Sequence, residues 1–403
     1  MKTKINAALE KANNFVNKGL FHDAITLCNK ELNFNPKNSI AWLIKGLANL
    51  KLNNYEDSII CNDRALREDN SLQVAWLNKG VAYKQIWKLK ESIFAYKKAI
   101  EINPKLNTMW INFARVYETM GDYTESEKCY KYILNNIDRN DSLAKYNLSL
   151  LSLKKGNLKE GFKNFEFRFD NHIYQKRRFI QIPLLKNLNK IKNKKILVWT
   201  EGGLGDAILF CRYLDELLKL GAQVAYEVQP QLIEIIKTLN PKIHYVSYKS
   251  KKLNKITFDF QIPLMSLPFI FQTNLKNIPK KSQYLKVDQK LNNYWRLELK
   301  KYSKPKIGLI WSSSSNAQSA QYRSIDINNL LPIIYKKYNY FSIQKTISDK
   351  ENIFLEENNI INFGHHNLNN IFAIINNLDL IISIDTLFVQ MAGLLNIPTW
   401  VML

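Results

Sequence analysis

The chain has 403 residues, of which 46% are hydrophobic and 23% are charged, a composition typical of a globular protein with two to four domains. Its 13 glycines, 11 prolines and four cysteines exclude collagen-like, mucin-like and disulfide-stapled proteins. No apolar run reaches 18 residues, because Asp379 and Asp385 interrupt the longest candidate, and the first residues lack a secretory signal pattern. We therefore expect a cytoplasmic protein without a membrane span.

The formal net charge of +23 suggests a basic surface for nucleic acid, anionic membrane or a phosphate-bearing substrate. The excess is mostly lysine, and a chain rich in lysine and asparagine can also reflect the composition of its genome. Basic residues gather between 171 and 200 without any acidic residue, so we interpret 169–194 as a solvated basic linker. Nucleic-acid binding is not expected, because no recognition motif accompanies the charge.

The cysteines are far apart in the sequence and form no CxxC pair: Cys28, Cys61, Cys129 and Cys211. Buried, reduced thiols are the expected state of such residues. His365 and His366 are adjacent, so they cannot form the i, i+4 helical pair that a zinc site uses. The sequence therefore predicts no metal site.

The first third of the chain is a repeat. Tryptophan recurs every 34 residues, at Trp42, Trp76 and Trp110, within the related segments AWLIKGLANL, AWLNKGVAYK and MWINFARVYE. Small residues follow each tryptophan by four positions, and the second half of each segment repeats too. The period resembles the tetratricopeptide repeat and predicts about five helix–turn–helix units over 1–168, stacked as an all-α solenoid with a concave face.

Asparagines occupy equivalent places in three consecutive units. Asn78 and Asn112 follow the tryptophan by two residues, and Asn147 holds the same place after a one-residue slip. An amide both donates and accepts, so a row of amides can hold a peptide main chain. The row is similar to the asparagine ladder of protein O-GlcNAc transferases, which implies a protein or peptide partner. The alternative is that asparagine is simply frequent in this chain.

From about residue 195, apolar runs alternate with helical patterns in two series, 195–303 and 304–403. The predicted strands are 195–200, 222–228, 243–248, 258–264, 306–312, 340–344, 360–364, 378–385 and 398–402. The predicted helices are 204–220, 231–239, 291–301, 327–337, 368–377 and 386–395. Such alternation predicts two parallel-sheet α/β domains, with ligands bound at the carboxyl ends of the strands.

A glycine-rich turn, GGLGD, follows the first predicted strand and opens a helix. Gly202, Gly203 and Gly205 let backbone N–H groups approach a bound group, while a helix start favours anions. Asp206 is either a functional carboxylate or a helix-capping residue.

In the second series, Asp385 and Thr386 end a strand directly before another helix. Arg323 and Lys345 are cations near other strand ends, and two such side chains can balance a diphosphate without a metal. Each of these residues alone is typical of an ordinary protein surface. Their combination is what indicates a ligand site.

Residues 158–403, with segments such as KILVWTEGGLGDAILFCRYL and LDLIISIDTLFVQMAGLLNIPTWVML, resemble the tetratricopeptide-repeat glycosyltransferases of bacteria. They are similar to the ADP-heptose:lipopolysaccharide heptosyltransferases and more distantly to O-linked GlcNAc transferases. The resemblance implies two Rossmann-like domains of the glycosyltransferase-B fold. It also implies inverting, metal-independent transfer of a sugar from a nucleotide-sugar substrate to an acceptor hydroxyl, without a cofactor.

The resemblance assigns roles by position. Asp206 would be the general base that takes the acceptor proton, and the three glycines before it would shape the acceptor side. The donor side would be formed by basic and polar residues of the second series: Arg323, Lys345, Asp385, Thr386 and Gln390.

Two departures from this family leave an alternative open. Gln390 stands where the relatives have histidine, and a neutral amide cannot carry positive charge. The relatives also continue beyond PTWVML, so we expect an incomplete donor half over 304–403. The alternative is a catalytically inactive repeat scaffold that binds proteins and carries a degenerate transferase domain.

Overall fold

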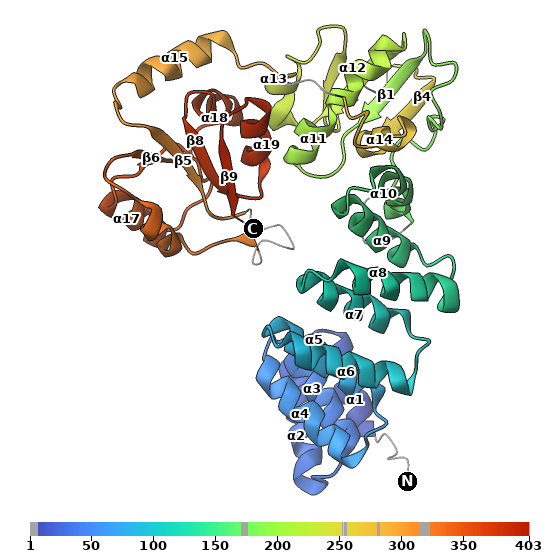
Figure 1. Ribbon diagram of the computed structural model, residues 1–403. Helices are drawn as coiled ribbons and strands as arrows, with labels where there is room; N and C mark the ends of the chain where they lie inside the picture. Colours follow the sequence, from blue (N-terminus) through green and yellow to red (C-terminus); the bar gives the residue numbers. More distant parts are fainter. Residues whose placement is uncertain are drawn as a thin grey trace. The chain divides into compact units, whose positions relative to one another are not determined.

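The computed structural model describes residues 7–170, 176–251, 253, 256–279, 283–313 and 323–402 (Figure 1). The chain divides into two compact units, Met1–Tyr174 and Gln175–Leu403. The first unit is helical and the second is α/β over the residues described. Among these residues, none of the helices combines the length and apolar character needed to cross a membrane.

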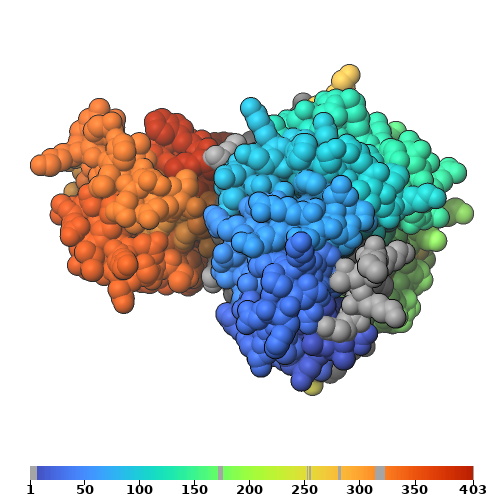
Figure 2. Space-filling view, turned by 90° about the horizontal axis from the view of Figure 1, so that it is seen from below, coloured from blue at the N-terminus to red at the C-terminus, as the bar shows by residue number. Residues whose placement is uncertain are grey.

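The first unit is a stack of helix pairs, as the 34-residue period predicts (Figure 1). Its helices are α1 (Ala7–Asn17), α2 (Phe21–Phe34), α3 (Ser39–Lys51), α4 (Tyr55–Glu68), α5 (Gln73–Gln85), α6 (Leu89–Ile102), α7 (Asn107–Thr119), α8 (Tyr123–Tyr132), α9 (Ser142–Lys154) and α10 (Leu158–Phe165). A π-helical turn, η1 (Ile133–Ile137), extends α8, and a 3-10 turn, η2 (Glu166–Phe169), follows α10. Side chains of successive helices form one continuous packed surface in blue and cyan (Figure 2).

Small residues explain how the two helices of a unit approach each other. A Cβ atom on Gly80 would lie 2.8 Å from the Tyr96 ring, so only glycine leaves room for that ring. The Ser92 hydroxyl donates to the Gly80 carbonyl at 2.7 Å. The preceding repeat has the equivalent hydrogen bond, from the Ser58 hydroxyl to the Gly46 carbonyl at 2.8 Å. The small residues therefore recur every 34 residues because each repeat contains the same close contact between its two helices.

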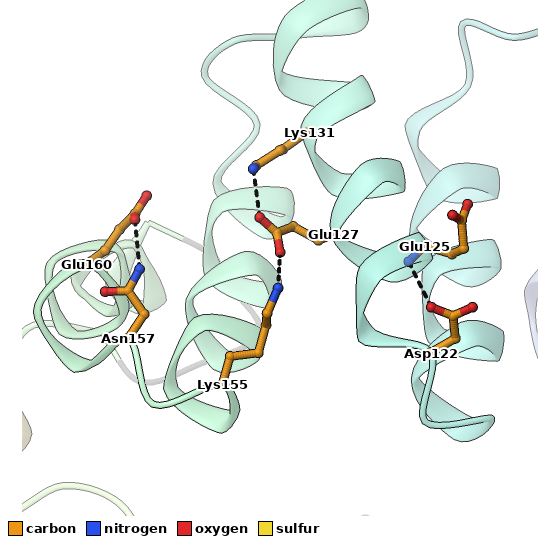
Figure 3. A network of polar contacts seen from close by, with 7 residues as sticks. All are labelled: Asp122, Glu125, Glu127, Lys131, Lys155, Asn157 and Glu160. Carbon is orange, nitrogen blue, oxygen red and sulfur yellow. Dashed lines mark hydrogen bonds and ion pairs between the residues drawn. The ribbon is translucent and has the colours of Figure 1, made fainter. Parts of the chain in front are cut away.

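A network of charges joins the last units (Figure 3). Glu127 on α8 accepts from Lys131 of the same helix at 2.6 Å and from Lys155, just after α9, at 2.5 Å. The hydrogen bonds from these two lysines hold the pKa of Glu127 below its usual value. Asp122 caps the start of α8 by accepting from the Glu125 N–H at 3.1 Å. Because exposed ion pairs contribute about 0–1 kcal/mol each, the network fixes orientation more than it adds stability.

The second unit contains two parallel sheets. The first consists of β1 (Lys195–Trp199), β2 (Gln223–Val228), β3 (His244–Ser247) and β4 (Phe260–Pro263). The second consists of β5 (Lys306–Ile310), β6 (Asn339–Ser342), β7 (Ile361–Asn362), β8 (Leu380–Ile384) and β9 (Thr399–Met402). Their spatial orders are β3-β2-β1-β4 and β7-β6-β5-β8-β9, all neighbours parallel. In each sheet the order reverses beside the first strand, where α/β proteins bind ligands.

The helices of the second unit differ from the prediction in several places. They are α11 (Leu204–Phe210), α12 (Arg212–Lys219), η3 (Pro230–Leu232), α13 (Ile233–Ile236), η5 (Leu264–Ser266), α14 (Leu267–Ile270), α15 (Gln289–Lys300), η6 (Ile327–Ile333), α17 (Asp349–Glu357), α18 (Leu368–Ile375) and α19 (Leu387–Leu394). The helix predicted over 204–220 is split in two, and the one predicted over 327–337 is a shorter 3-10 helix, Ile327–Ile333, which contains Pro332. Helix α17, opened by a capping box between Ser348 and Glu351, was not predicted.

The interpretation of 169–194 as a solvated linker is wrong for the residues from 176 onward, which belong to the second unit. Leu185 and Ile191 are 3% and 2% exposed within its core. Arg178 forms two hydrogen bonds, of 2.6 and 2.7 Å, to the fully buried carboxylate of Glu227 on β2. The basic run therefore contributes packing and a buried ion pair, in addition to surface charge.

Candidate functional site

The turn between β1 and α11 is built around its glycines and Asp206. Gly202 adopts φ of +72°, and a Cβ there would lie 2.5 Å from Oδ2 of Asp206 and 3.1 Å from Sδ of Met265. Oδ2 of Asp206 accepts from the Gly203 N–H at 2.7 Å and so satisfies the backbone donor of the residue that precedes α11. Asp206 thus caps α11, the simpler of its two sequence interpretations, and still lies half-buried at the carboxyl end of β1.

The electrostatic surroundings of Asp206 favour its protonated form. Burial is the largest cause and raises the pKa of this carboxyl group, and the nearby charge of Asp385 raises it further. The Gly203 N–H and the Arg323 guanidinium act in the opposite direction and lower it. A carboxylate with a raised pKa is a stronger base than an ordinary surface aspartate. Groups from both sheets therefore act on Asp206.

On the second sheet, β8 ends just before Asp385 and Thr386. Nη1 of Arg323 lies 3.5 Å from the Asp385 carbonyl oxygen and 3.7 Å from its carboxylate Oδ2. The two side chains are 42% and 53% exposed, so both are accessible to a ligand. The Thr386 hydroxyl lies 3.2 Å from that of Ser383, at the start of α19. Arg323 therefore contacts Asp385 at this strand end, and Thr386 is the next residue in the chain.

Helices α11 and α19 are in contact, which brings the two strand ends together (Figure 1). A Cβ on Gly205 would lie 3.5 Å from Oε1 of Gln390 and 3.7 Å from the Leu387 Cα, so the glycine permits this approach. Oε1 of Gln390 is buried and has no hydrogen-bond partner among the described residues. The Gln390 amide thus lies at the junction of the two sheets, and its Oε1 is able to accept a hydrogen bond from a ligand.

Lys345 lies apart from this group in its contacts. It follows β6, and its Nζ donates to the carbonyl of His366 at 2.9 Å. Burial lowers the pKa of the His366 imidazole, with smaller contributions from His365 and Lys345. The structure therefore brings Asp206, Arg323 and Asp385 together and leaves Lys345 with the histidines.

Two further polar residues near the strand ends were not predicted from the sequence. Glu201, directly after β1, is 5% exposed and accepts from the Met265 N–H at 3.1 Å. Gln344, after β6, is also 5% exposed and accepts from the N–H groups of Trp311 and Ser312 at 3.3 and 3.1 Å. Each shapes a turn at the carboxyl edge of its sheet. Both residues directly follow or end a predicted strand, and this position could have indicated from the sequence that they lie near the site.

The asparagine row of the repeat array is only partly accessible. Asn78 is 3% exposed and its amide donates to Asn62 of the neighbouring helix at 3.3 Å. Because the Asn78 side chain is buried and hydrogen-bonded to Asn62, its amide is not available to a peptide. The prediction that Asn78 binds a peptide main chain is therefore wrong. Asn112 and Asn147 are half-buried.

A pocket of about 760 Å³ opens at the amino edge of the first sheet, beside the first residues of β1 and β2. Lys195, Gln223 and His244 line it, whereas Asp206 and the other predicted site residues do not. Ligands of parallel-sheet proteins bind at the opposite edge. The junction around Asp206 is therefore the stronger candidate site despite the size of this pocket.

Comparison with known proteins agrees with the repeat. The tetratricopeptide repeat family matches residues 74–106 and 108–132. Protein FlbA of Caulobacter vibrioides is 24% identical over 198 residues, which are 45% of this chain and 33% of its own length, so the match spans about a third of that relative.

Similar solved structures align with about two fifths of the chain. A crystal structure of MamA is 22% identical and covers 41% of this chain and 93% of its own, with a TM-score of 0.37. A thermophilic TPR protein of Thermus thermophilus is 18% identical, covers 41% and 90%, and has a TM-score of 0.36. YrrB, described as a TPR protein with an unusual peptide-binding site, is 16% identical, covers 41% and 87%, and has a TM-score of 0.35.

Proposed function

We propose that the second unit is an inverting glycosyltransferase of the glycosyltransferase-B fold, which moves a sugar from a nucleotide-sugar donor to an acceptor hydroxyl. The observation that carries this proposal is Asp206, a half-buried carboxylate of raised pKa. It lies where the carboxyl ends of two parallel sheets meet, within the electrostatic influence of Arg323 and Asp385. The strand orders, which correspond to 3-2-1-4 and 3-2-1-4-5 in chain order, support two Rossmann-like domains.

The proposed reaction needs a base on one side and a cation on the other. Asp206 takes the proton of the acceptor hydroxyl while the hydroxyl oxygen attacks the anomeric carbon of the sugar. The bond from that carbon to the diphosphate breaks, and the diphosphate leaves with the electron pair. Arg323 and the N–H groups at the start of α19 then balance the new negative charge. The lack of side chains at Gly202 and Gly203 leaves the acceptor side open.

Gln390 and Lys345 modify the donor side of this proposal. The Gln390 amide can donate a hydrogen bond to a phosphate oxygen, although it supplies no positive charge. Lys345 would reach a diphosphate only by giving up its hydrogen bond to the His366 carbonyl. Arg323 is thus the principal cation of the proposed donor site.

Calorimetry with UDP, GDP and ADP on the full chain tests the donor site. We expect micromolar binding of one of them, weakened about tenfold or more by Arg323→Gln. Release of that nucleotide from its sugar conjugate then tests transfer, and Asp206→Asn should abolish it while nucleotide binding remains. Glu357→Gln, an exposed substitution on α17, is the matched control. Unchanged transfer in Asp206→Asn would refute the base assignment.

A second candidate function is a protein-binding scaffold. Tetratricopeptide repeats occupy the first unit and are typical of proteins that bind other proteins, so a protein partner on this unit is supported whether or not transfer occurs. Gln390, in place of the family's histidine, favours an inactive second unit. Absence of nucleotide binding by the intact, folded chain would favour this scaffold function over transfer.

A further inference from the structure

Trp87, in the turn between α5 and α6, has a backbone conformation that is unusual for a large side chain. Its φ is +59°, in the left-handed region. The corresponding turns of the other four helix pairs also contain a left-handed residue, but there it is always glycine or asparagine: Gly19, Asn53, Gly121 and Gly156. Glycine adopts this conformation without steric cost, and asparagine adopts it more readily than an aromatic residue does. Trp87 is therefore the exception in the series.

The hydrogen bonds of the turn show that the repeat imposes this conformation on Trp87. The Trp87 N–H donates to the Lys84 carbonyl at 3.1 Å. The next N–H along the chain, of Lys88, donates to the Tyr83 carbonyl at 2.9 Å. The Gly121 turn has the equivalent two bonds, also of 3.1 and 2.9 Å. They end the first helix in a Schellman motif, whose left-handed position is usually glycine. Glycine or asparagine at position 87 would therefore serve the fold.

The Trp87 side chain makes no polar or aromatic contact that would offset the steric cost. It is 67% exposed, and neither its indole N–H nor its ring has a partner among the described residues. By contrast, the indole N–H groups of Trp42 and Trp110 donate to backbone carbonyls at 2.8 Å. A residue that is strained, exposed and unused by the fold points to a partner outside the chain.

Lysines, and no acidic residues, occur within three positions of Trp87. The segment 84–90, KQIWKLK, contains Lys84, Lys88 and Lys90. Lys88 and Lys90 are exposed, and neither ammonium group has an ion pair or hydrogen bond within the part of the chain that the structure describes. The turn thus presents a large amphipathic ring between cations. This matches an anionic lipid surface, because indole rings lie at the headgroup level and the surface charge attracts lysines.

We propose that the turn between α5 and α6 docks the chain on a membrane that contains anionic lipids, with Trp87 entering the headgroup region. Contacts join α3 to α5 and α5 to α7, so the turns of successive units follow one another along one edge of the array. Met120, just before Gly121 in the next turn, is 46% exposed and adds apolar area to this edge. A protein partner would need a hollow lined with acidic groups to receive the turn, whereas a lipid surface needs no matching shape. The inference does not depend on sugar transfer.

Co-sedimentation of the full chain with sucrose-loaded vesicles tests this docking site. Vesicles of phosphatidylcholine and phosphatidylglycerol in equal parts are compared with vesicles of phosphatidylcholine alone. We expect tighter binding to the anionic vesicles, with an affinity that falls as salt rises. Trp87→Asn, which copies the Asn53 turn, should weaken binding about tenfold, because the buried ring is lost. Lys88→Gln and Lys90→Gln should each weaken it about fivefold.

Phe34 and Lys37 provide matched controls. Phe34 is 90% exposed at the end of α2, and Lys37 is exposed in the turn that follows. That turn joins two units, whereas the Trp87 turn lies within one. Phe34→Ser and Lys37→Gln should each change binding less than twofold. In Trp87→Asn, peptides that cover α5 and α6 should exchange hydrogen no faster than in the wild type, because asparagine suits the left-handed turn.

Several results would overturn the inference. An equal loss in either control would mean that any exposed aromatic ring or lysine is sufficient. Equal binding to phosphatidylcholine vesicles, or unchanged binding by Trp87→Asn, would exclude the anionic surface or the ring. Faster hydrogen exchange in Trp87→Asn would show that the ring stabilises the fold, which removes the reason to expect a partner. Absence of binding to the anionic vesicles refutes the lipid surface, and if a hexaglutamate peptide then binds through Trp87, the partner is an acidic protein.

Discussion

Replacing Arg178 by methionine should destabilise the second unit by about 3–5 kcal/mol, because it leaves a buried carboxylate without its counter-charge. Glu227 is fully buried on β2 and accepts two hydrogen bonds from Arg178. After the substitution, only the Lys249 N–H, at 2.9 Å, would remain among the partners described for that carboxylate. The guanidinium also lies 4.8 Å from the Phe179 and Tyr248 ring centres, so its loss removes packing as well.

The large destabilisation expected for Arg178→Met follows from the burial of Glu227. An exposed ion pair of the same unit provides the control. Lys237 and Glu234 pair on the surface, with side chains 50% and 53% exposed, and such pairs contribute about 0–1 kcal/mol. Lys237→Met should therefore have little effect. Replacing both buried partners, in Arg178→Met with Glu227→Leu, should recover much of the loss, because no unpaired charge then remains.

Hydrogen exchange followed by mass spectrometry is the suitable assay, since whole-chain signals mix the two units. The free energy of opening is read from peptides that cover β2, Gln223–Val228, in the wild type and in the three variants. Protection in Arg178→Met within about 0.5 kcal/mol of the wild type would refute the reasoning, on the scale set by exposed pairs. So would an equal loss in the Lys237→Met control.

Two other predictions concern the repeat packing and the pH response of the site. Gly80→Ala should destabilise the first unit by about 1–3 kcal/mol, because its Cβ would meet the Tyr96 ring. Gly393→Ala, with no atom within 4 Å of the new Cβ, should be neutral or stabilise the second unit by up to about 1 kcal/mol. Hydrogen exchange in peptides that cover α5 and α19 measures each effect in its own unit. The raised pKa of Asp206 means that the folded state favours the protonated form, so its stability contribution is present at low pH and lost as pH rises through that pKa. Asp206→Asn should therefore gain stability relative to the wild type as pH increases. A constant difference between the two in the free energy of opening of β1, read by hydrogen exchange across the pH range, would contradict this.

Strand positions could be predicted because apolar runs in parallel sheets have clear ends. The segment 195–200 became β1, and the two strand-end motifs around Asp206 and Asp385 meet as expected. Chain order places each motif at the carboxyl edge of its own sheet, since the carboxyl ends of parallel strands share one edge. The contact between α11 and α19, which brings the two edges together, could not be predicted from it.

What the sequence could not reveal depends on partners distant in the chain. Arg178 binds a carboxylate 49 positions away, so its local charge run looked like a solvated segment. Asn78 shared its place with two other asparagines, yet its contact with Asn62 was set by packing between helices. Lys345 lies near a strand end, as Arg323 does, but its ammonium group donates a hydrogen bond to the His366 carbonyl. In each case periodicity gave the position of the residue and tertiary contacts gave its environment.

The buried thiols make it possible to follow the two units separately in the intact chain. Cys28, Cys61 and Cys129 lie in the repeat array and Cys211 lies in the core of the second unit, all of them free and buried. Burial raises the pKa of the Cys28 and Cys129 thiols to about 12, so alkylation at neutral pH must wait for local opening. The rate at which iodoacetamide labels each cysteine, read by peptide mass, thus measures how often each half of the molecule opens, without a tag or a truncated fragment.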